Sequence, residues 1–235
     1  CAITPEPPKL PSQEKSIIPA CDCDIERYER LVKETADLPG IGGYKIGFVL
    51  GLTVGLPRAV EIARRYTQKP LIYDHQKAGT DIPDTGKQFA RLCKEAGLDA
   101  VILFPQAGPE TERAWIDFAR GEDLEVIVGG LMTHRKYVRS EGGYIADEAV
   151  IEIYERAAGL GVNDYVVPGN NPEAIRKIRG MLEREHSKPV FYSPGFVAQG
   201  GTIADAVAAA GDHYHAFVGR GIYESQDMRA AAEEL

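Results

Sequence analysis

Three charged side chains follow an apolar run near residue 72 and could form a catalytic cluster. Within Leu71–Gly86, LIYDHQKAGTDIPDTG, the apolar start reads as a buried strand, and Asp74, Lys77 and Asp81 come just after it. Burying carboxylates beside an ammonium group is costly unless the charges pair with one another. The segment therefore predicts an active site at the carboxyl end of a strand, and the alternative is a solvated loop with incidental charge.

A glycine-rich segment near the end of the chain has the composition of a phosphate-binding loop. It is Ser193–Gly201, SPGFVAQGG, which precedes a helix predicted to begin near Thr202, and Arg220 follows later. Glycines let backbone N–H groups approach an anion, a helix N-terminus adds positive potential, and arginine adds a bidentate charged donor. These features predict a phosphorylated ligand, and the alternative is a glycine-rich turn with a surface arginine.

Short apolar runs alternate with amphipathic, helix-length segments along the chain. The predicted strands are Ser16–Cys21, Gly43–Phe48, Pro70–Asp74, Ala100–Phe104, Glu125–Gly129, Asp164–Val167, Pro189–Tyr192 and His215–Gly219. The predicted helices are Ile25–Ala36, Leu56–Tyr66, Thr85–Ala96, Pro109–Arg120, Ala146–Gly159, Pro172–Glu183, Thr202–Ala209 and one after Gln226.

Eight β–α repeats with continuously apolar strands predict a parallel sheet covered by helices, and this number favours closure into a (β/α)₈ TIM barrel. The alternative is a Rossmann-like sheet, but no Gly-x-Gly-x-x-Gly follows the first strand. We expect a proline-rich extended arm over residues 1–16 and one barrel domain over residues 17–235. In a barrel the charged and glycine-rich motifs would share the mouth at the carboxyl ends of the strands.

Composition limits the classes of function. The 235 residues suffice for one barrel, and no apolar run approaches the length of a membrane helix. A formal net charge of −8 argues against binding to nucleic acid or to an anionic membrane. The four cysteines form neither a disulfide-rich pattern nor a zinc site, so we expect reduced thiols, a cytoplasmic protein and no metal. The first residues have no hydrophobic signal core.

These motifs, with GGYKIG (Gly42–Gly47), MTH (Met132–His134), DIPDT (Asp81–Thr85) and FVGRGIY (Phe217–Tyr223), resemble the orotidine 5′-phosphate decarboxylase family. The resemblance covers nearly the whole chain from Ile17 to Tyr223. It implies decarboxylation of orotidine 5′-phosphate to UMP in pyrimidine biosynthesis, without a cofactor. It also implies a homodimer whose active sites are shared between subunits.

The resemblance carries residue roles onto this chain. Lys45, Asp74, Lys77 and Asp81 match the family's alternating charge array, in which Lys77 donates the proton and Asp81 comes from the partner subunit. The substrate-binding positions are the ribose contacts Asp22 and Thr85, the pyrimidine contact Thr133, and the loop and phosphate contacts Pro194, Gln199, Gly200, Gly219 and Arg220.

The spacing of the array departs from the family pattern. The family has Asp-x-Lys-x-x-Asp, whereas this chain has one more residue in each interval between Asp74, Lys77 and Asp81. Residues two apart on a strand share a face, but residues three apart do not. The strand must therefore end before Lys77 or contain a bulge, and Gly79 could absorb the second extra residue.

Two other functions remain open. A Mg²⁺-dependent sugar-phosphate decarboxylase or synthase of the same superfamily would need an acidic metal ligand where this chain has Lys45, whose charge would repel the cation. A barrel that binds nucleotide phosphates without catalysis would keep the phosphate loop but lack turnover.

Overall fold

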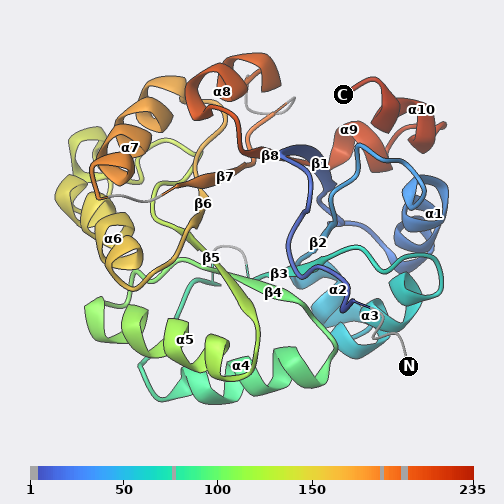
Figure 1. Ribbon diagram of the computed structural model, residues 1–235, viewed down its shortest axis with the longest axis horizontal. Coiled ribbons are helices and arrows are strands. Elements are labelled where there is room, and N and C mark those ends of the chain that lie inside the picture. Colours follow the sequence, from blue (N-terminus) through green and yellow to red (C-terminus); the bar gives the residue numbers. More distant parts are fainter. Residues whose placement is uncertain (1–4, 76–77, 186–187, 197–200) are drawn as a thin grey trace.

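The computed structural model describes residues 5–75, 78–185, 188–196 and 201–235. Eight parallel strands form a single sheet in this part of the chain, and helices surround it (Figure 1). The strands are β1 (Lys15–Pro19), β2 (Tyr44–Ile46), β3 (Leu71–Asp74), β4 (Ala100–Leu103), β5 (Glu125–Gly129), β6 (Asp164–Val166), β7 (Val190–Ser193) and β8 (Tyr214–Val218).

The sheet curls into a nearly closed barrel, which confirms the predicted (β/α)₈ fold. Its strands pair in the order β1-β8-β7-β6-β5-β4-β3-β2, always in parallel. Between the two ends of this order, single parallel bridges join Ile17 to Ile41 and Ala20 to Lys45. The amide of Cys21 also donates to the carbonyl oxygen of Lys45 at 2.9 Å, which ties β1 to β2.

Helices follow the strands and pack against the outside of the barrel. They are α1 (Ile25–Thr35), α2 (Phe48–Thr53), α3 (Leu56–Arg64), α4 (Thr85–Glu95), α5 (Pro109–Gly121), the 3₁₀ turn η2 (Arg139–Glu141), α6 (Asp147–Gly159), α7 (Pro172–Arg184), α8 (Ile203–Ala210), α9 (Arg220–Tyr223) and α10 (Met228–Glu233). None of these helices is long and apolar enough to cross a membrane.

The sequence predicted all eight strands and eight of the helices, with ends within two residues of those observed. It did not predict α2, η2 or α9. Phe48, expected to end the second strand, instead begins α2, because the extended backbone of Gly47 caps that helix. These additional elements are short and follow strands at the barrel mouth, where a few residues give no helical period.

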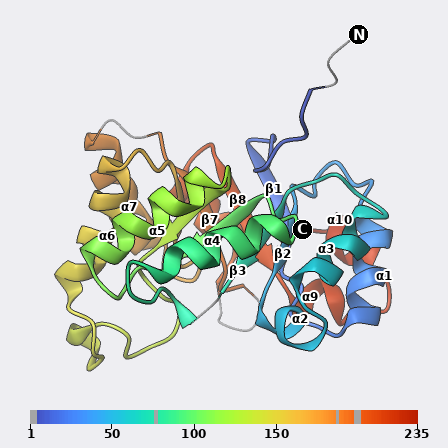
Figure 2. The same cartoon turned by 90° about the horizontal axis from the view of Figure 1, so that it is seen from below.

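Two apolar clusters hold the barrel together. One lies between strands and helices, and the other fills the barrel interior with residues that include Ile72, Ile102 and Phe217. Leu10 of the N-terminal arm packs against the interior cluster. The arm leaves the barrel at one end, whereas α2 and α9 lie at the opposite end (Figure 2). The carboxyl ends of the strands therefore face away from the arm.

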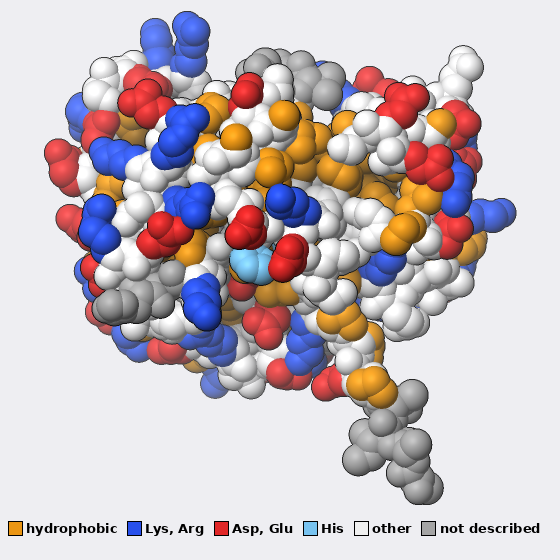
Figure 3. Space-filling model, turned by 45° about the horizontal axis from the view of Figure 1, so that its top comes forward, with side chains coloured by type: hydrophobic (Ala, Val, Ile, Leu, Met, Phe, Trp, Pro, Cys, Tyr) orange, Lys and Arg blue, Asp and Glu red, His pale blue; other side chains and the backbone are white. Residues whose placement is uncertain are grey.

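The surface mixes charges of both signs. On the face shown in Figure 3, basic and acidic side chains are interspersed and do not form one continuous basic patch. Many pair along single helices, for example Arg113 with Glu110 and Asp117 on α5. Exposed pairs of this kind contribute little stability each, about 0.2–1 kcal/mol.

One buried carboxyl outside the barrel mouth should make stability depend on pH. Glu112 of α5 is 2% exposed, and its Oε1 has no hydrogen-bond partner in the described part of the chain. Burial raises the pKa of Glu112 to about 8, against an opposing effect of Arg156. The carboxyl of Glu112 thus keeps its proton in the folded state up to about pH 8, whereas it loses that proton near pH 4.5 in the unfolded chain. The contribution of Glu112 to the free energy of unfolding is therefore lost as pH rises from about 4.5 to 8.

Glu112→Gln keeps the side-chain shape but cannot ionise. We expect the variant to be more stable than the parent at pH 8, by a few kcal/mol on an order-of-magnitude scale, and this difference to shrink towards pH 5. Thermal unfolding measured from pH 5 to 8 tests this, with Glu110→Gln, an exposed change in the same helical turn, as the control. An equal pH dependence of Tm in Glu112→Gln and the parent would contradict it.

Candidate active site

A cavity of about 200 Å³ opens at the carboxyl ends of β1, β2, β7 and β8. Asp22 and Lys45 contribute charged side chains from one side of the barrel. The glycine-rich segments after β7 and β8, which the sequence predicted to bind phosphate, lie on the other side. The lining residues are Ala20, Asp22, Lys45, Pro194, Gly195, Phe196, Phe217, Val218, Gly219, Arg220, Gly221 and Tyr223. Five of the substrate and array positions predicted from the sequence are thereby gathered around one space.

Lys45 and Asp74 form a buried ion pair beside this cavity. On β2, Tyr44 and Ile46 pack towards the helices, so Lys45 between them points into the barrel. Its Nζ donates to Oδ2 of Asp74 at 2.6 Å, and the two side chains are only 7% and 14% exposed. Burial opposes the charge on Lys45, but the carboxylates of Asp74 and Asp22 outweigh it and raise the pKa of Lys45. The lysine is therefore a permanent cation at neutral pH.

Asp22 lies across the same cavity with an unused acceptor. Its Oδ1 is buried and has no hydrogen-bond partner among the described residues. A buried polar atom without a partner is costly, and a bound ligand that donates a hydrogen bond would remove that cost. Asp22 is therefore placed to accept a hydrogen bond from a hydroxyl group of a ligand.

In the lengthened array segment, Asp74–Asp81, the side chains of the first two residues still point to opposite faces, as they do on a regular strand. Asp74 faces inward, whereas Nδ1 of His75 lies 2.7 Å from the hydroxyl of Tyr73 on the outward face. Lys77 lies outside the described residues. Gly79 has φ of +66°, a left-handed conformation that favours glycine, and its role in accommodating the extra residue stays a prediction.

Within the described part of the chain, Asp81, the last residue of the array, and Thr85 are not among the residues that line the cavity. The side chain of Asp81 is exposed, and Thr85 begins α4, where its hydroxyl donates to the carbonyl oxygen of Ile82 at 2.8 Å. Among the described residues, the carboxylate that pairs with Lys45 is that of Asp74.

Thr133 contacts the base of the glycine-rich loop. A Cβ atom on Gly195 would lie 3.2 Å from Cγ2 of Thr133, and the carbonyl oxygen of Thr133 accepts a hydrogen bond from Nδ2 of Asn170 at 3.1 Å. The loop after β6, which carries Asn170, thus supports both segments. Gln199 and Gly200 lie outside the described residues.

The end of β8 supplies the remaining predicted positions. Gly219 caps α9, its carbonyl oxygen accepts from the amide of Ile222 at 2.9 Å, and Arg220 is exposed at the cavity rim. Sequence reasoning missed Phe217, whose ring centroid lies 5.3 Å from Nζ of Lys45. Its inward place two residues before Gly219 follows from strand alternation, which could have identified it.

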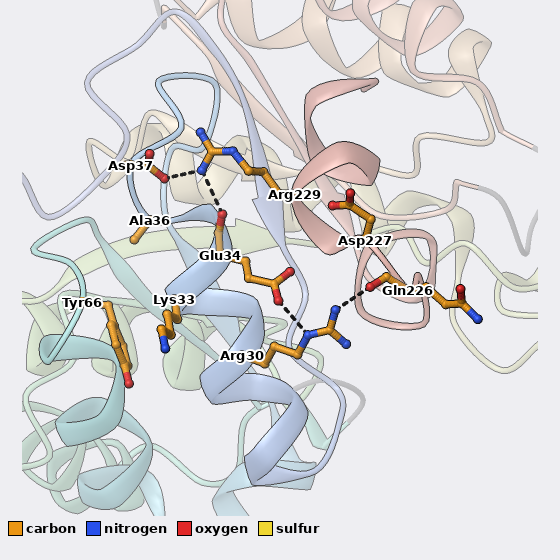
Figure 4. A pocket seen from close by; sticks show the side chains of 9 residues that line it. All are labelled: Arg30, Lys33, Glu34, Ala36, Asp37, Tyr66, Gln226, Asp227 and Arg229. Carbon is orange, nitrogen blue, oxygen red and sulfur yellow. Dashed lines mark hydrogen bonds and ion pairs between the residues drawn. The ribbon is translucent and has the colours of Figure 1, made fainter.

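A larger cavity, of about 730 Å³, lies between α1 and α10 on the outside of the barrel (Figure 4). Several of its charged side chains are bound to one another or to the backbone. Arg30 pairs with Glu34, and Arg229 bonds to Asp37 at 2.7 Å and to the carbonyl oxygen of Glu34. These bonds fasten the C-terminal helix to α1, so we assign this cavity a structural role, despite its size.

Residues 16–235 match the model of the family described as "Orotidine 5'-phosphate decarboxylase / HUMPS family". The chain is 32% identical over 214 residues to the orotidine 5′-phosphate decarboxylase of Methanosarcina barkeri, with 90% of each chain covered. It is 30% identical over 224 residues to that of Thermococcus kodakarensis, with 95% of this chain and 96% of the relative covered.

Solved structures agree with these relatives. The orotidine 5′-monophosphate decarboxylase of Methanocaldococcus jannaschii, complexed with the inhibitor BMP, superposes with a TM-score of 0.80 at 26% identity and covers 94% of this chain and 96% of that chain. The orotidine 5′-phosphate decarboxylase of Pyrococcus horikoshii gives a TM-score of 0.75 at 29% identity, covering 93% and 96% of the two chains.

Proposed function

The chain belongs to the orotidine 5′-phosphate decarboxylase / HUMPS family. We propose that the site at its barrel mouth catalyses decarboxylation without a metal ion or an organic cofactor. The reaction is that of a carboxy-lyase of pyrimidine biosynthesis, the decarboxylation of orotidine 5′-phosphate to UMP. The observation that carries this assignment is the buried Lys45–Asp74 pair beside a cavity that also contains Asp22 and Arg220.

Decarboxylation at C6 requires charged groups that stabilise the negative charge left on that carbon. When the C6–carboxylate bond breaks, its electron pair stays on C6, where no adjacent group can delocalise it. Preorganised cations stabilise such a developing charge better than water does. In our proposal Asp74 faces the substrate carboxylate and Lys77 transfers a proton to C6, so that CO₂ leaves and UMP forms. Lys45, cationic because of its carboxylate neighbours, holds Asp74 in place.

The other end of the cavity suits the 5′-phosphate. Backbone N–H groups near Gly219, together with the guanidinium of Arg220, would bind the phosphate oxygens, and Pro194 forms the opposite wall. Gln199 and Gly200 would close over the substrate. Asp22 and Thr85 would bind the ribose, and Thr133 the edge of the pyrimidine.

We propose that two subunits complete each site. Asp81 is exposed and is not among the residues that line the cavity of its own chain, and the apolar side chain next to it, Ile82, is 60% exposed. A second copy packed against this segment would bury the side chain of Ile82 and bring its own Asp81 and Thr85 to the site. In a two-fold dimer both sites would be completed in the same way. We place this homodimer in the cytoplasm.

Turnover by the metal-depleted protein tests the proposed function. We expect the absorbance change of orotidine 5′-phosphate consumption to proceed at the same rate in EDTA as with added Mg²⁺, because Lys45 occupies the position beside Asp74 that a cation would need. Activity that is lost in EDTA and restored by Mg²⁺ would favour the metal-dependent alternative. Tight binding of UMP without any turnover would instead indicate a non-catalytic nucleotide-binding barrel.

A further inference from the structure

The lengthened array segment rests against the loop that follows β4. Gly79 is buried there, and a Cβ atom on it would lie 3.1 Å from the carbonyl oxygen of Phe104 and 3.8 Å from Oε1 of Gln106. The amide of Gln106 also donates to the Phe104 carbonyl oxygen at 2.8 Å, which tightens that loop. The side chain of Gln106 therefore forms part of the wall against which Gly79 packs.

A bond from the next loop holds that wall in place. Nε2 of Gln106 donates to the hydroxyl oxygen of Tyr137 at 2.9 Å. Tyr137 is 9% exposed, and its ring meets the ring of His134 edge-on with centroids 5.6 Å apart. His134 directly follows Thr133. A hydrogen bond to a buried phenol fixes a glutamine side chain that, being exposed, would otherwise sample several rotamers.

We propose that Gln106 and Tyr137 act together as positioning residues that compensate for the extra residue between Lys77 and Asp81. Their bond fixes the wall behind Gly79, and so sets where residues 78–81 lie relative to Thr133. Neither side chain needs to touch the substrate. The inference rests on the proposed function, because it concerns the alignment of that function's charge array.

Removing the bond should reduce turnover more than binding. We expect Tyr137→Phe and Gln106→Met each to lower kcat by about 10- to 100-fold, the scale of loss that follows a misplacement of about 1 Å in a catalytic array. The KM for orotidine 5′-phosphate and the Kd for UMP should stay close to the parent values, because the phosphate end of the cavity lies on other loops. The double variant should be no slower than either single variant, since both remove the same bond.

The control is Tyr66→Phe, which deletes a hydroxyl bonded to Glu29 on the outside of the barrel. All variants are assayed well below their measured Tm, so that a loss of folded protein is not counted as a loss of kcat. Unchanged kcat in either single variant, or losses that multiply in the double variant, would overturn the positioning role. Absence of turnover in the parent protein would instead refute the proposed function, which keeps the two failures distinguishable.

Discussion

Lys77→Ala is expected to lower kcat for orotidine 5′-phosphate by about 10²- to 10⁴-fold, the usual contribution of a positioned proton donor. The same variant should still bind UMP, because the phosphate contacts that we propose lie at the ends of β7 and β8 rather than in the array. Stopped assays with high enzyme concentration measure the residual turnover, and titration with UMP measures binding. Turnover near the parent rate would show that the proton donor is not Lys77, and that the longer spacing moves another residue into that role.

Arg220→Ala provides the contrasting behaviour. It removes the guanidinium that we propose binds the phosphate, a charge-assisted contact worth about 1.5–3 kcal/mol, or about 10- to 150-fold in kcat/KM. The loss should appear largely as weaker binding of both substrate and UMP. If Lys77→Ala mainly lowers kcat and Arg220→Ala mainly weakens binding, the two variants together would support the division of the cavity into an array end and a phosphate end.

Mixing two inactive variants should restore activity if sites are shared. Lys77→Ala and Asp81→Ala are each expected to be inactive as homodimers. In a mixed dimer, one of the two sites would combine Lys77 from one chain with Asp81 from the other and would be intact. With random subunit exchange about half of the dimers are mixed, so we expect up to about a quarter of the parent activity per site.

Subunit exchange must be verified in that experiment, for example by native mass spectrometry of differently tagged chains. The matched control mixes Lys77→Ala with Lys45→Ala, because both residues come from the same chain in our proposal and no mixed site is intact. Recovery only in the first mixture supports the shared site. No recovery in either mixture, with folded and exchanged subunits, would place Asp81 and Lys77 in the same chain's site.

Much of this architecture was predictable from the sequence because the apolar runs and the helix caps indicate the same fold. The eight strands were found from apolar runs, and helix starts such as Asn171-Pro172 were found from their caps. The barrel then places the ends of those strands at one mouth. The pairing of Lys45 with Asp74 follows from the inward position of both side chains on neighbouring strands.

The parts that sequence reasoning missed depend on contacts between distant segments. Gln106 and Tyr137 are 31 residues apart and lie in no recognised motif, so their bond becomes visible only when the loops after β4 and β5 are placed side by side. The burial of Glu112 is hidden for a similar reason, since a glutamate in the first turn of a helix usually serves the exposed N-terminus.

Our proposal is that this barrel replaces the carboxylate on C6 with a proton and uses no metal to do so. Its most direct test is proton NMR of the product formed from orotidine 5′-phosphate by metal-depleted protein in D₂O. We predict that UMP accumulates with deuterium at C6, one deuteron for each CO₂ released, because Lys77 exchanges its protons with solvent before each transfer. Failure to form UMP, or its formation only after Mg²⁺ is added, would contradict the account.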